Sequence, residues 1–110
     1  MKAYFFVNVL EVLDTEKMEA YRRRVFDVVA QFGGHYRVLA GPFEVVEGNW
    51  QPTFPVLIEF PSLETARRWY DSPEYAELKA MRLAATRSEA VFFAPYQPAG
   101  VAAAAVPAEA

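Results

Sequence analysis

The sequence contains no cysteine and a single histidine among its 110 residues. Disulfide bonds, thiolate nucleophiles and zinc–sulfur sites are therefore excluded, and one histidine supplies too few ligands for a typical zinc site. The sequence also lacks a glycine-rich phosphate loop, a nucleophile elbow and an HExxH motif. We accordingly expect neither a bound metal nor a cofactor, and nothing in the sequence indicates covalent catalysis.

Long hydrophobic runs and an excess of positive charge are missing too. No segment approaches the roughly 18 consecutive apolar residues of a membrane-spanning helix, and Asn8 and Glu11 interrupt the apolar start too early for a signal peptide. The net charge of −3 gives no bulk attraction to nucleic acid. The basic cluster Arg22–Arg24 lies in a helical pattern flanked by acids, which favours a solvated helix face. We expect a cytoplasmic protein without nucleic-acid or membrane partners.

Apolar residues, in contrast, are abundant. Hydrophobic residues make up 54% and aromatic residues 15% of the chain, more than is usual for a globular domain. A chain of 110 residues builds one modest core, so a second subunit would help to bury the surplus. Residues 97–110 are mostly alanine, and we expect them to form a C-terminal tail that follows a single domain at residues 1–96.

The spacing of the apolar residues changes between strand-like and helix-like along the chain. The expected elements are strands at 3–12, 35–40, 54–60 and 89–96, a candidate continuation at 43–47 after a break at Gly41-Pro42, and helices capped by Asp14 or Thr15, by Ser62 and by Ser72. Gly33-Gly34 should end the first helix, because glycine adopts the left-handed C-terminal conformation without strain. This order predicts a ferredoxin-like α+β fold, in which the helices cover one face of an antiparallel sheet.

The strands at 3–12, 54–60 and 89–96 carry mainly apolar residues on both faces. A strand that is covered on both sides has this pattern, whereas a strand with one wet face alternates apolar and polar residues. Because the helices cover only one face, we expect the second face to be covered by another subunit. Trp50 lies in a predicted turn, and we interpret it as a dimer contact. The sequence therefore predicts a homodimer that forms through its sheet.

Glu59 is a candidate catalytic residue, because a carboxylate inside an apolar strand needs a partner. It would act as a general base or polar anchor, or it would be structural, either paired with Arg37 or Arg82 or reaching solvent at the end of the strand. His35 is the second catalytic candidate, since a histidine exchanges protons near neutral pH; a partly exposed histidine without such a role is the alternative. Arg37 alternates with Tyr36 and so shares a face with His35. Its planar fork could bind a carboxylate or phosphate, and an inter-subunit or sheet–helix ion pair is the alternative.

The remaining candidates are aromatic or basic residues on helical stripes and strands. Tyr21 and Tyr70 have the spacing of core residues, although their hydroxyl groups could line a pocket. Tyr36 lies between two other candidates on its strand, and Arg82 lies on the last helix, where it could orient an anion. We therefore expect a ligand-binding set of Tyr21, Tyr36, Arg37, Tyr70 and Arg82.

Several short motifs, taken together, carry a resemblance to a known family. They are Tyr21, Gly33-Gly34-His35-Tyr36, Glu47-Gly48-Asn49-Trp50-Gln51-Pro52, Glu59-Phe60-Pro61-Ser62, Ala66, Tyr70, Ser72-Pro73-Glu74-Tyr75 and Arg82. In order and spacing they resemble the domain-of-unknown-function family 1330, over about residues 3–96. The resemblance implies a dimeric α+β barrel, in which two ferredoxin-like subunits press their sheets together. The wider superfamily holds monooxygenases, isomerases, haem-degrading enzymes and stress-induced proteins.

The chain departs from the family pattern at two places. His35 stands where the family commonly has arginine or lysine, and Leu39, Ala40 and Gly41 stand where it often has Arg-Gly-Gly. If this arginine binds an anionic ligand in relatives, the resemblance does not imply that this chain binds the same ligand.

Two functional hypotheses follow from the sequence. The first is an enzyme without a cofactor that acts on a small organic molecule, with Glu59 and His35 as its catalytic residues. The second is a non-catalytic ligand-binding or stress-related homodimer whose polar residues are structural. The first rests on analogy within the superfamily, and a shared fold does not establish a shared function.

Overall fold

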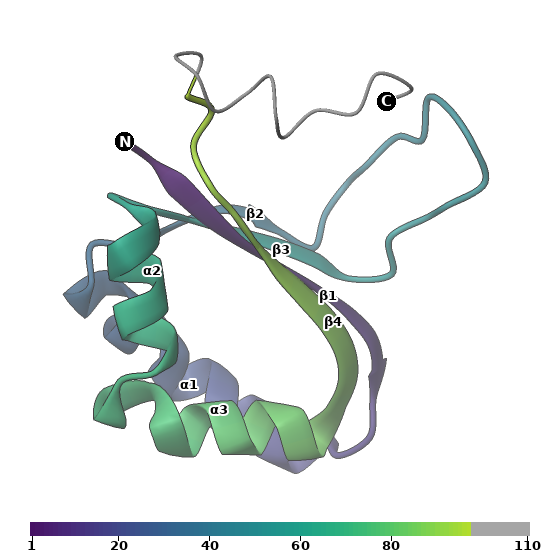
Figure 1. The fold of residues 1–110 in the computed structure, drawn as a ribbon. Helices are drawn as coiled ribbons and strands as arrows, with labels where there is room; N and C mark the ends of the chain where they lie inside the picture. The colour runs from purple at the N-terminus through teal and green to yellow at the C-terminus, as the bar shows by residue number, and fades with distance from the viewer. Residues whose placement is uncertain (98–110) are drawn as a thin grey trace.

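The computed structural model describes residues 1–97 of the chain. Its elements are β1 (Ala3–Val12), α1 (Thr15–Gln31), β2 (His35–Leu39), β3 (Pro55–Phe60), α2 (Leu63–Tyr70), α3 (Pro73–Ala85) and β4 (Thr86–Phe93). The four strands form one antiparallel sheet in the order β2-β3-β1-β4. All three helices lie on the same face of this sheet (Figure 1). The ferredoxin-like α+β fold is confirmed.

The helices begin at the capping residues that the sequence indicates. The side chains of Asp14, Ser62 and Ser72 each accept a hydrogen bond from the backbone N–H three residues later. Pro73 occupies the first turn of α3, where its missing N–H is not needed. Gly33 ends the first helical segment with a φ of 74°, a left-handed conformation that favours glycine.

β2 and β3 match the predicted strands to within one residue, whereas β4, which also ends at Phe93 and not at 96, and the predicted continuation at 43–47 differ from the prediction. β4 begins at Thr86, three residues before the expected start at Glu89, because α3 passes directly into it and Thr86 pairs with Val12 of β1. The predicted continuation at 43–47 does not form a strand. Ala40 has a φ of 69° and its N–H donates to the carbonyl of Pro55, so the ladder between β2 and β3 closes there and the chain leaves the sheet.

The core lies between the helices and the inner face of the sheet. Phe5 of β1 packs edge-on against Trp69 of α2, with 5.1 Å between ring centroids, and Trp69 packs against Tyr75 of α3 at 4.3 Å. Trp69 and Tyr75 are fully buried. This aromatic cluster joins the central strand to two helices, and burial of rings of this size contributes much of the stability of a small domain.

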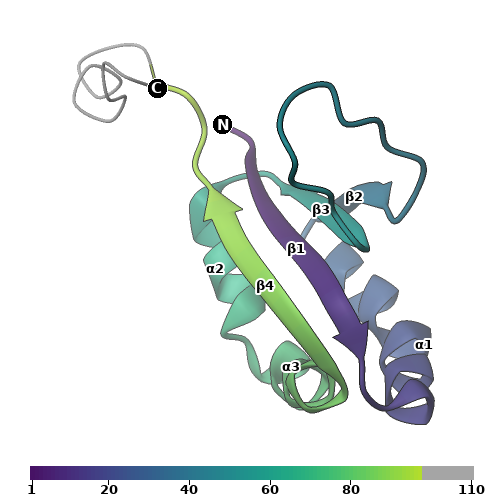
Figure 2. The same cartoon turned by 90° about the vertical axis from the view of Figure 1, so that its right-hand side faces the viewer.

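The outer face of the sheet carries an apolar row and no helix. Val91, Phe6, Leu57 and Val38 lie side by side across the four strands. Val91 and Val38 are 45% and 40% exposed. Figure 2 shows the long sheet strands with the helices behind them and the 40–54 loop extending at one end. We call this surface the outer face.

Within residues 1–97, no helix is both long enough and apolar enough to cross a membrane. The same part of the chain contains no group of three or more His, Cys, Asp or Glu residues that is arranged to hold a metal ion. The Ala-rich tail predicted for 97–110 lies, apart from Gln97, outside the described residues.

Gly34 marks a close approach between α1 and β3, and we predict that Gly34→Ala destabilises the fold. An added Cβ would lie 2.5 Å from Cγ1 of Val29 and 2.9 Å from Cε1 of Phe60. Overpacking of this kind costs about 1–3 kcal/mol, which urea denaturation would detect. Gly41→Ala is the matched control, because nothing lies within 4 Å of its added Cβ. Equal stability of the two variants would contradict the prediction.

Candidate functional site

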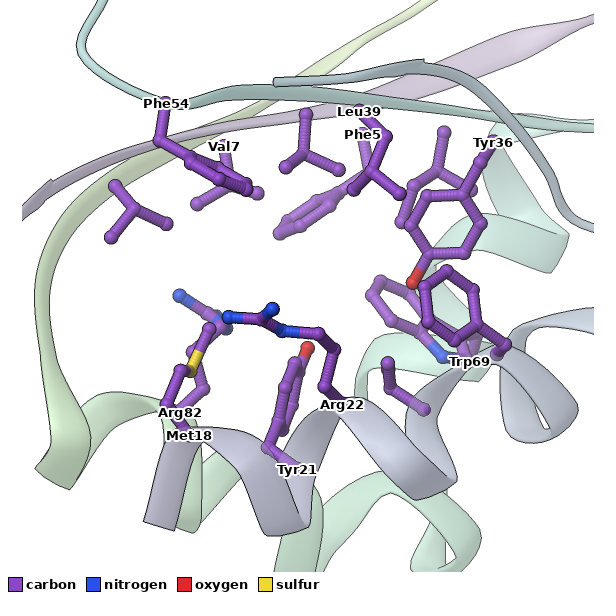
Figure 3. Close-up of a pocket in the computed structure, with 15 residues that line it drawn as sticks. Phe5, Val7, Met18, Tyr21, Arg22, Tyr36, Leu39, Phe54, Trp69 and Arg82 are labelled. Carbon is purple, nitrogen blue, oxygen red and sulfur yellow. The ribbon is translucent and has the colours of Figure 1, made fainter. Parts of the chain in front are cut away.

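A cavity of about 120 Å³ lies between the helical layer and the inner face of the sheet. We call it the inner pocket. The sheet forms one wall, and α1 and α3 form the other (Figure 3). The lining residues are Phe5, Val7, Val9, Met18, Tyr21, Arg22, Val25, Phe26, Tyr36, Leu39, Phe54, Val56, Ile58, Trp69 and Arg82.

The inner pocket is mainly apolar, and its volume suits only a small ligand. The central strands contribute only Phe5, Val7 and Val9 from β1 and Val56 and Ile58 from β3. An apolar cavity of about 150 Å³ holds benzene, and this pocket is somewhat smaller at about 120 Å³, so one aromatic ring is the upper limit for a ligand inside it. Pockets for small organic ligands are typically apolar with a few convergent polar groups.

Arg82 is the deepest of those polar groups. Its side chain is buried, with 3% of the residue exposed. Its Nε donates to the hydroxyl of Tyr75 at 3.3 Å, and its Nη1 donates to the hydroxyl of Ser88 at 3.0 Å. Burial acts to lower the pKa of Arg82, but the neighbouring Tyr75 and Tyr21 outweigh it and leave the pKa raised. The guanidinium therefore stays charged, and within residues 1–97 it has no acidic partner.

Tyr21 connects this arginine to α1. Its hydroxyl lies 2.8 Å from the hydroxyl of Tyr75, which is completely buried behind the pocket wall. Burial, first of all, and the nearby Tyr75 raise the pKa of Tyr21 well above its ordinary value. Tyr21 therefore keeps its proton at physiological pH and can donate it in a hydrogen bond. Tyr21, Tyr75 and Arg82 form one hydrogen-bonded chain, which we call the inner network.

Arg22 provides a second positive charge at the mouth of the pocket. In Figure 3 the guanidinium groups of Arg22 and Arg82 both point into the space between the helices and the sheet. Arg22 is exposed, and its Nη1 lies 4.0 Å from Oε1 of Glu19, the outer limit of an ion pair. The sequence favoured a solvated face for the whole Arg22–Arg24 cluster. That interpretation overlooked Arg22, which follows the core residue Tyr21 and so lies at the edge of the buried stripe.

Glu59, the main catalytic candidate, lies on the outer face, away from the inner pocket. Its carboxylate accepts hydrogen bonds from Lys2 at 2.9 Å and Arg37 at 3.2 Å, and a weaker one from Tyr4 at 3.4 Å. The hydrogen bonds from Lys2 and Arg37 lower the pKa of Glu59 to about 2. A carboxylate with so low a pKa is a weak proton acceptor at neutral pH.

His35 and Arg37 accompany Glu59 on the outer face. His35 is directly opposite Glu59 in the ladder between β2 and β3, so the two side chains share a face. Arg37 sits at an irregularity of the same ladder and reaches Glu59 from there. The structure thus brings together three residues that the sequence singled out, and it offers the ion pair with Arg37 that was one interpretation of Glu59.

Three of the other candidates meet in the inner pocket. Tyr21, Tyr36 and Arg82 all line it, from α1, β2 and α3. Tyr70 does not; its ring packs against Phe5, and the ammonium of Lys79 lies 4.2 Å from the ring centroid. The sequence candidates are therefore divided between two faces of the sheet, and the ligand-binding set does not form one site.

The ion pairs of Glu59 predict a specific pH dependence of stability. Because its pKa in the folded state is lowered from 4.5 to about 2, Glu59 stabilises the fold above pH 4.5, and this contribution is lost as the pH falls to about 2. We expect the urea midpoint of Glu59→Gln to fall less steeply with acidification over this range than that of the wild type. The matched control Glu64→Gln changes an acid for which no such ion pair is found in the described residues. Parallel pH profiles for the wild type and Glu59→Gln would contradict the assignment.

Several solved structures share the fold of this protein. A protein of unknown function from Rhodopseudomonas palustris is 23% identical, with a TM-score of 0.67 over 88% of this chain and 84% of its own. A dimeric ferredoxin-like protein of unknown function from Jannaschia sp. CCS1 is 11% identical, with a TM-score of 0.63 over 86% of this chain and 100% of its own. SnoaB, a cofactor-independent oxygenase from Streptomyces nogalater, is 13% identical, with a TM-score of 0.58 over 90% and 97% of the two chains.

No match to a curated protein sequence is found. The model of the Domain of unknown function family (DUF1330) matches residues 2–96, nearly all of the part of the chain that the structure describes. The match agrees with the motifs that the sequence shares with this family, and the chain belongs to the DUF1330 family.

Proposed function

We propose that the protein is a homodimer that binds a small, single-ring aromatic anion in the inner pocket. The observation that carries this proposal is the buried guanidinium of Arg82, which has no acidic partner within residues 1–97 and lines an apolar cavity. Moving a charge away from water is costly unless it is paired. The neutral hydroxyl groups of Tyr75 and Ser88 compensate only partly, so an anionic ligand would complete the environment of Arg82.

The charge balance of the pocket supports an anion over a neutral or cationic ligand. Arg22 and Arg82 are charged, and the lining residues include no aspartate, glutamate or histidine. Two positive charges beside a low-dielectric cavity attract an anion more strongly than they would in water. Arginine is also well suited to a carboxylate, because its planar fork can donate two parallel hydrogen bonds.

The shape of the pocket supports a flat apolar body for the ligand. Phe5, Phe26, Tyr36 and Trp69 contribute ring surfaces to its walls. Aromatic groups pack favourably against one another in offset or edge-to-face geometries. The volume of about 120 Å³ and the two arginines together suit a molecule such as benzoate.

The second candidate function is a cofactor-independent enzyme that acts in the inner pocket. Glu59 would not be a catalytic residue of this enzyme, because it does not line the pocket. The fold is shared with SnoaB, whose described activity is a cofactor-independent oxygenase, although a shared fold does not transfer an activity. The inner pocket has no side chain that is a good proton acceptor, and Glu59 and His35 lie on the outer face. Catalysis would therefore act on a ligand that loses its proton to water.

We further propose that the outer face forms the homodimer. Its apolar row and the neighbouring Phe93, which is 50% exposed, are more apolar surface than a monomeric sheet usually leaves uncovered. The Jannaschia structure that shares this fold is described as dimeric. A second copy of the chain would cover the face with a surface of the same composition, as in other isologous dimers. A cytoplasmic location of this dimer stays a prediction from the sequence.

We predict that Arg22→Gln weakens benzoate binding about three- to tenfold in isothermal titration calorimetry, because an exposed charge-assisted contact is lost. Arg23→Gln is the matched control, since it removes the same charge from the next position of α1 without changing the pocket lining. Arg82→Gln should abolish measurable binding, provided that its unfolding curve shows a folded protein. Unchanged affinity in Arg22→Gln, or an absence of binding by the wild type, would overturn the proposal.

For the dimer we predict that Val91→Glu shifts the protein to monomers in sedimentation-velocity measurements. The substitution places a charge at the β4 end of the apolar row, opposite Phe6, where desolvation of the charge opposes association. Leu83→Glu is the control, because Leu83 is 57% exposed on α3 and lies outside the outer face. A wild-type monomer, or a dimer that only Leu83→Glu disrupts, would show that the outer face is not the interface.

A further inference from the structure

We infer that the inner pocket binds a single-ring phenol or cyclic enol as its conjugate base, held by the hydroxyl of Tyr21 and the guanidinium of Arg82. This inference rests on the proposed function and deepens it by naming the class of ligand. It also assigns a positioning role to Tyr75, which does not line the pocket but orients the hydroxyl of Tyr21 toward it.

The direction of the hydrogen bonds in the inner network follows from what each group can donate. A guanidinium has no acceptor, so Arg82 Nε donates to the oxygen of Tyr75. Two arrangements then remain for the 2.8 Å contact between Tyr75 and Tyr21. If Tyr21 donated to Tyr75, the hydroxyl hydrogen of Tyr75 would be fully buried with no acceptor in the described residues, and such unsatisfied groups are rare and costly.

In the other arrangement the fully buried hydroxyl of Tyr75 has both an acceptor and a donor as partners. Tyr75 donates to the oxygen of Tyr21, and the hydroxyl hydrogen of Tyr21 is left free to donate elsewhere. Tyr21 lines the pocket, whereas Tyr75 does not. Each hydrogen bond in such a chain polarises the next, so the charge of Arg82 strengthens the donor at Tyr21. The network therefore presents the hydrogen of Tyr21 to a ligand oxygen.

Every helix or strand that contributes an ionisable side chain to the pocket contributes a hydrogen-bond donor or a positive charge for the ligand oxygen. α1 supplies Tyr21 and Arg22, α3 supplies Arg82, with Tyr75 behind it, and β2 supplies Tyr36. Burial raises the pKa of Tyr21 and of Tyr36, so both are protonated donors. β1 and β3 contribute only apolar residues to the lining, and none of the lining residues is acidic.

This environment favours the ionised form of a weakly acidic hydroxyl group. Nearby positive charge and hydrogen bonds to the charged form both lower the pKa of an acid. Ionisation breaks the O–H bond of the ligand and leaves the electron pair on its oxygen. The proton passes to water at the mouth of the pocket, beside the exposed Arg22, because no lining side chain accepts it. The bound phenolate or enolate is more nucleophilic than the neutral molecule, so binding itself activates the ligand.

The probe for this inference is 4-nitrophenol, whose ionised form absorbs visible light and its neutral form does not. We expect the wild-type protein to lower the apparent pKa of bound 4-nitrophenol by about one unit, which corresponds to roughly tenfold tighter binding of the anion. Tyr75→Phe should reduce this shift by at least about half while 4-nitrophenol still binds, since the pocket lining is unchanged and only the polarised chain is broken. Tyr70→Phe is the matched control, because Tyr70 belongs to the aromatic cluster and not to the pocket or the inner network.

The outcomes separate this inference from the proposed function. If benzoate binds but 4-nitrophenol does not, or if 4-nitrophenol binds with an unchanged or raised pKa, the inference is overturned and the anion pocket stands. If neither molecule binds, both fail. A pKa shift that Tyr75→Phe leaves intact would overturn the positioning role of Tyr75. Should Tyr75→Phe not fold, Arg22→Gln replaces it, and the expected result is again a smaller shift than in the wild type.

Discussion

The buried guanidinium of Arg82 joins α1, α3 and β4 through its own hydrogen bonds and those of its partner Tyr75. A charge that is 97% removed from solvent must be hydrogen-bonded, and here its partners come from its own helix and from the adjoining strand. Tyr75 extends these contacts to Tyr21, so the inner network ties α1 to α3, and the hydrogen bond from Arg82 to Ser88 ties α3 to β4. The same contacts keep a polar end on an otherwise apolar cavity. Stability and ligand recognition therefore depend on one set of atoms.

The two faces of the sheet have different roles in this account (Figure 1). The inner face packs against the helices and leaves the pocket, whereas the outer face carries an apolar row and the ion-paired Glu59. Because side chains alternate along a strand, each strand contributes to both faces at once. Phe5 and Phe6 are neighbours in the sequence, yet Phe5 lines the pocket and Phe6 faces outward. A single run of apolar residues can thus serve a core and an interface.

The fold was predictable from the sequence because its signals are local. Ser62, Ser72-Pro73 and the glycine pair at 33–34 set helix boundaries through contacts within three or four residues, and these boundaries are found in the structure. The start of β4 and the path of residues 43–47 were predicted wrongly, because they depend on pairing with distant strands. Thr86 pairs with Val12, and the bond between Ala40 and Pro55 closes the ladder.

The candidate site was only partly predictable, since it depends on which face each residue occupies. The sequence identified Tyr21, Tyr36 and Arg82, but it grouped them with Arg37, whose ion pair with Glu59 places it on the outer face. Alternation along β2 already placed Arg37 with His35 and apart from Tyr36, but which of them faces the pocket follows only from the pairing of β2 with β3. Burial of Arg82 had no local signal, because an arginine in a helix is usually exposed. Arg22 was missed because it was read as one member of a charged run.

A crystal structure of the protein with 4-bromobenzoate would show directly whether the inner pocket binds an aromatic anion, because the anomalous signal of bromine locates the ligand. The account predicts one molecule in the inner pocket, with its carboxylate oxygens within hydrogen-bonding distance of Arg82 and Tyr21 and its ring between the helices and the sheet. Bromine bound only at the outer face, or an inner pocket that stays empty at a saturating concentration of the ligand, would contradict the account.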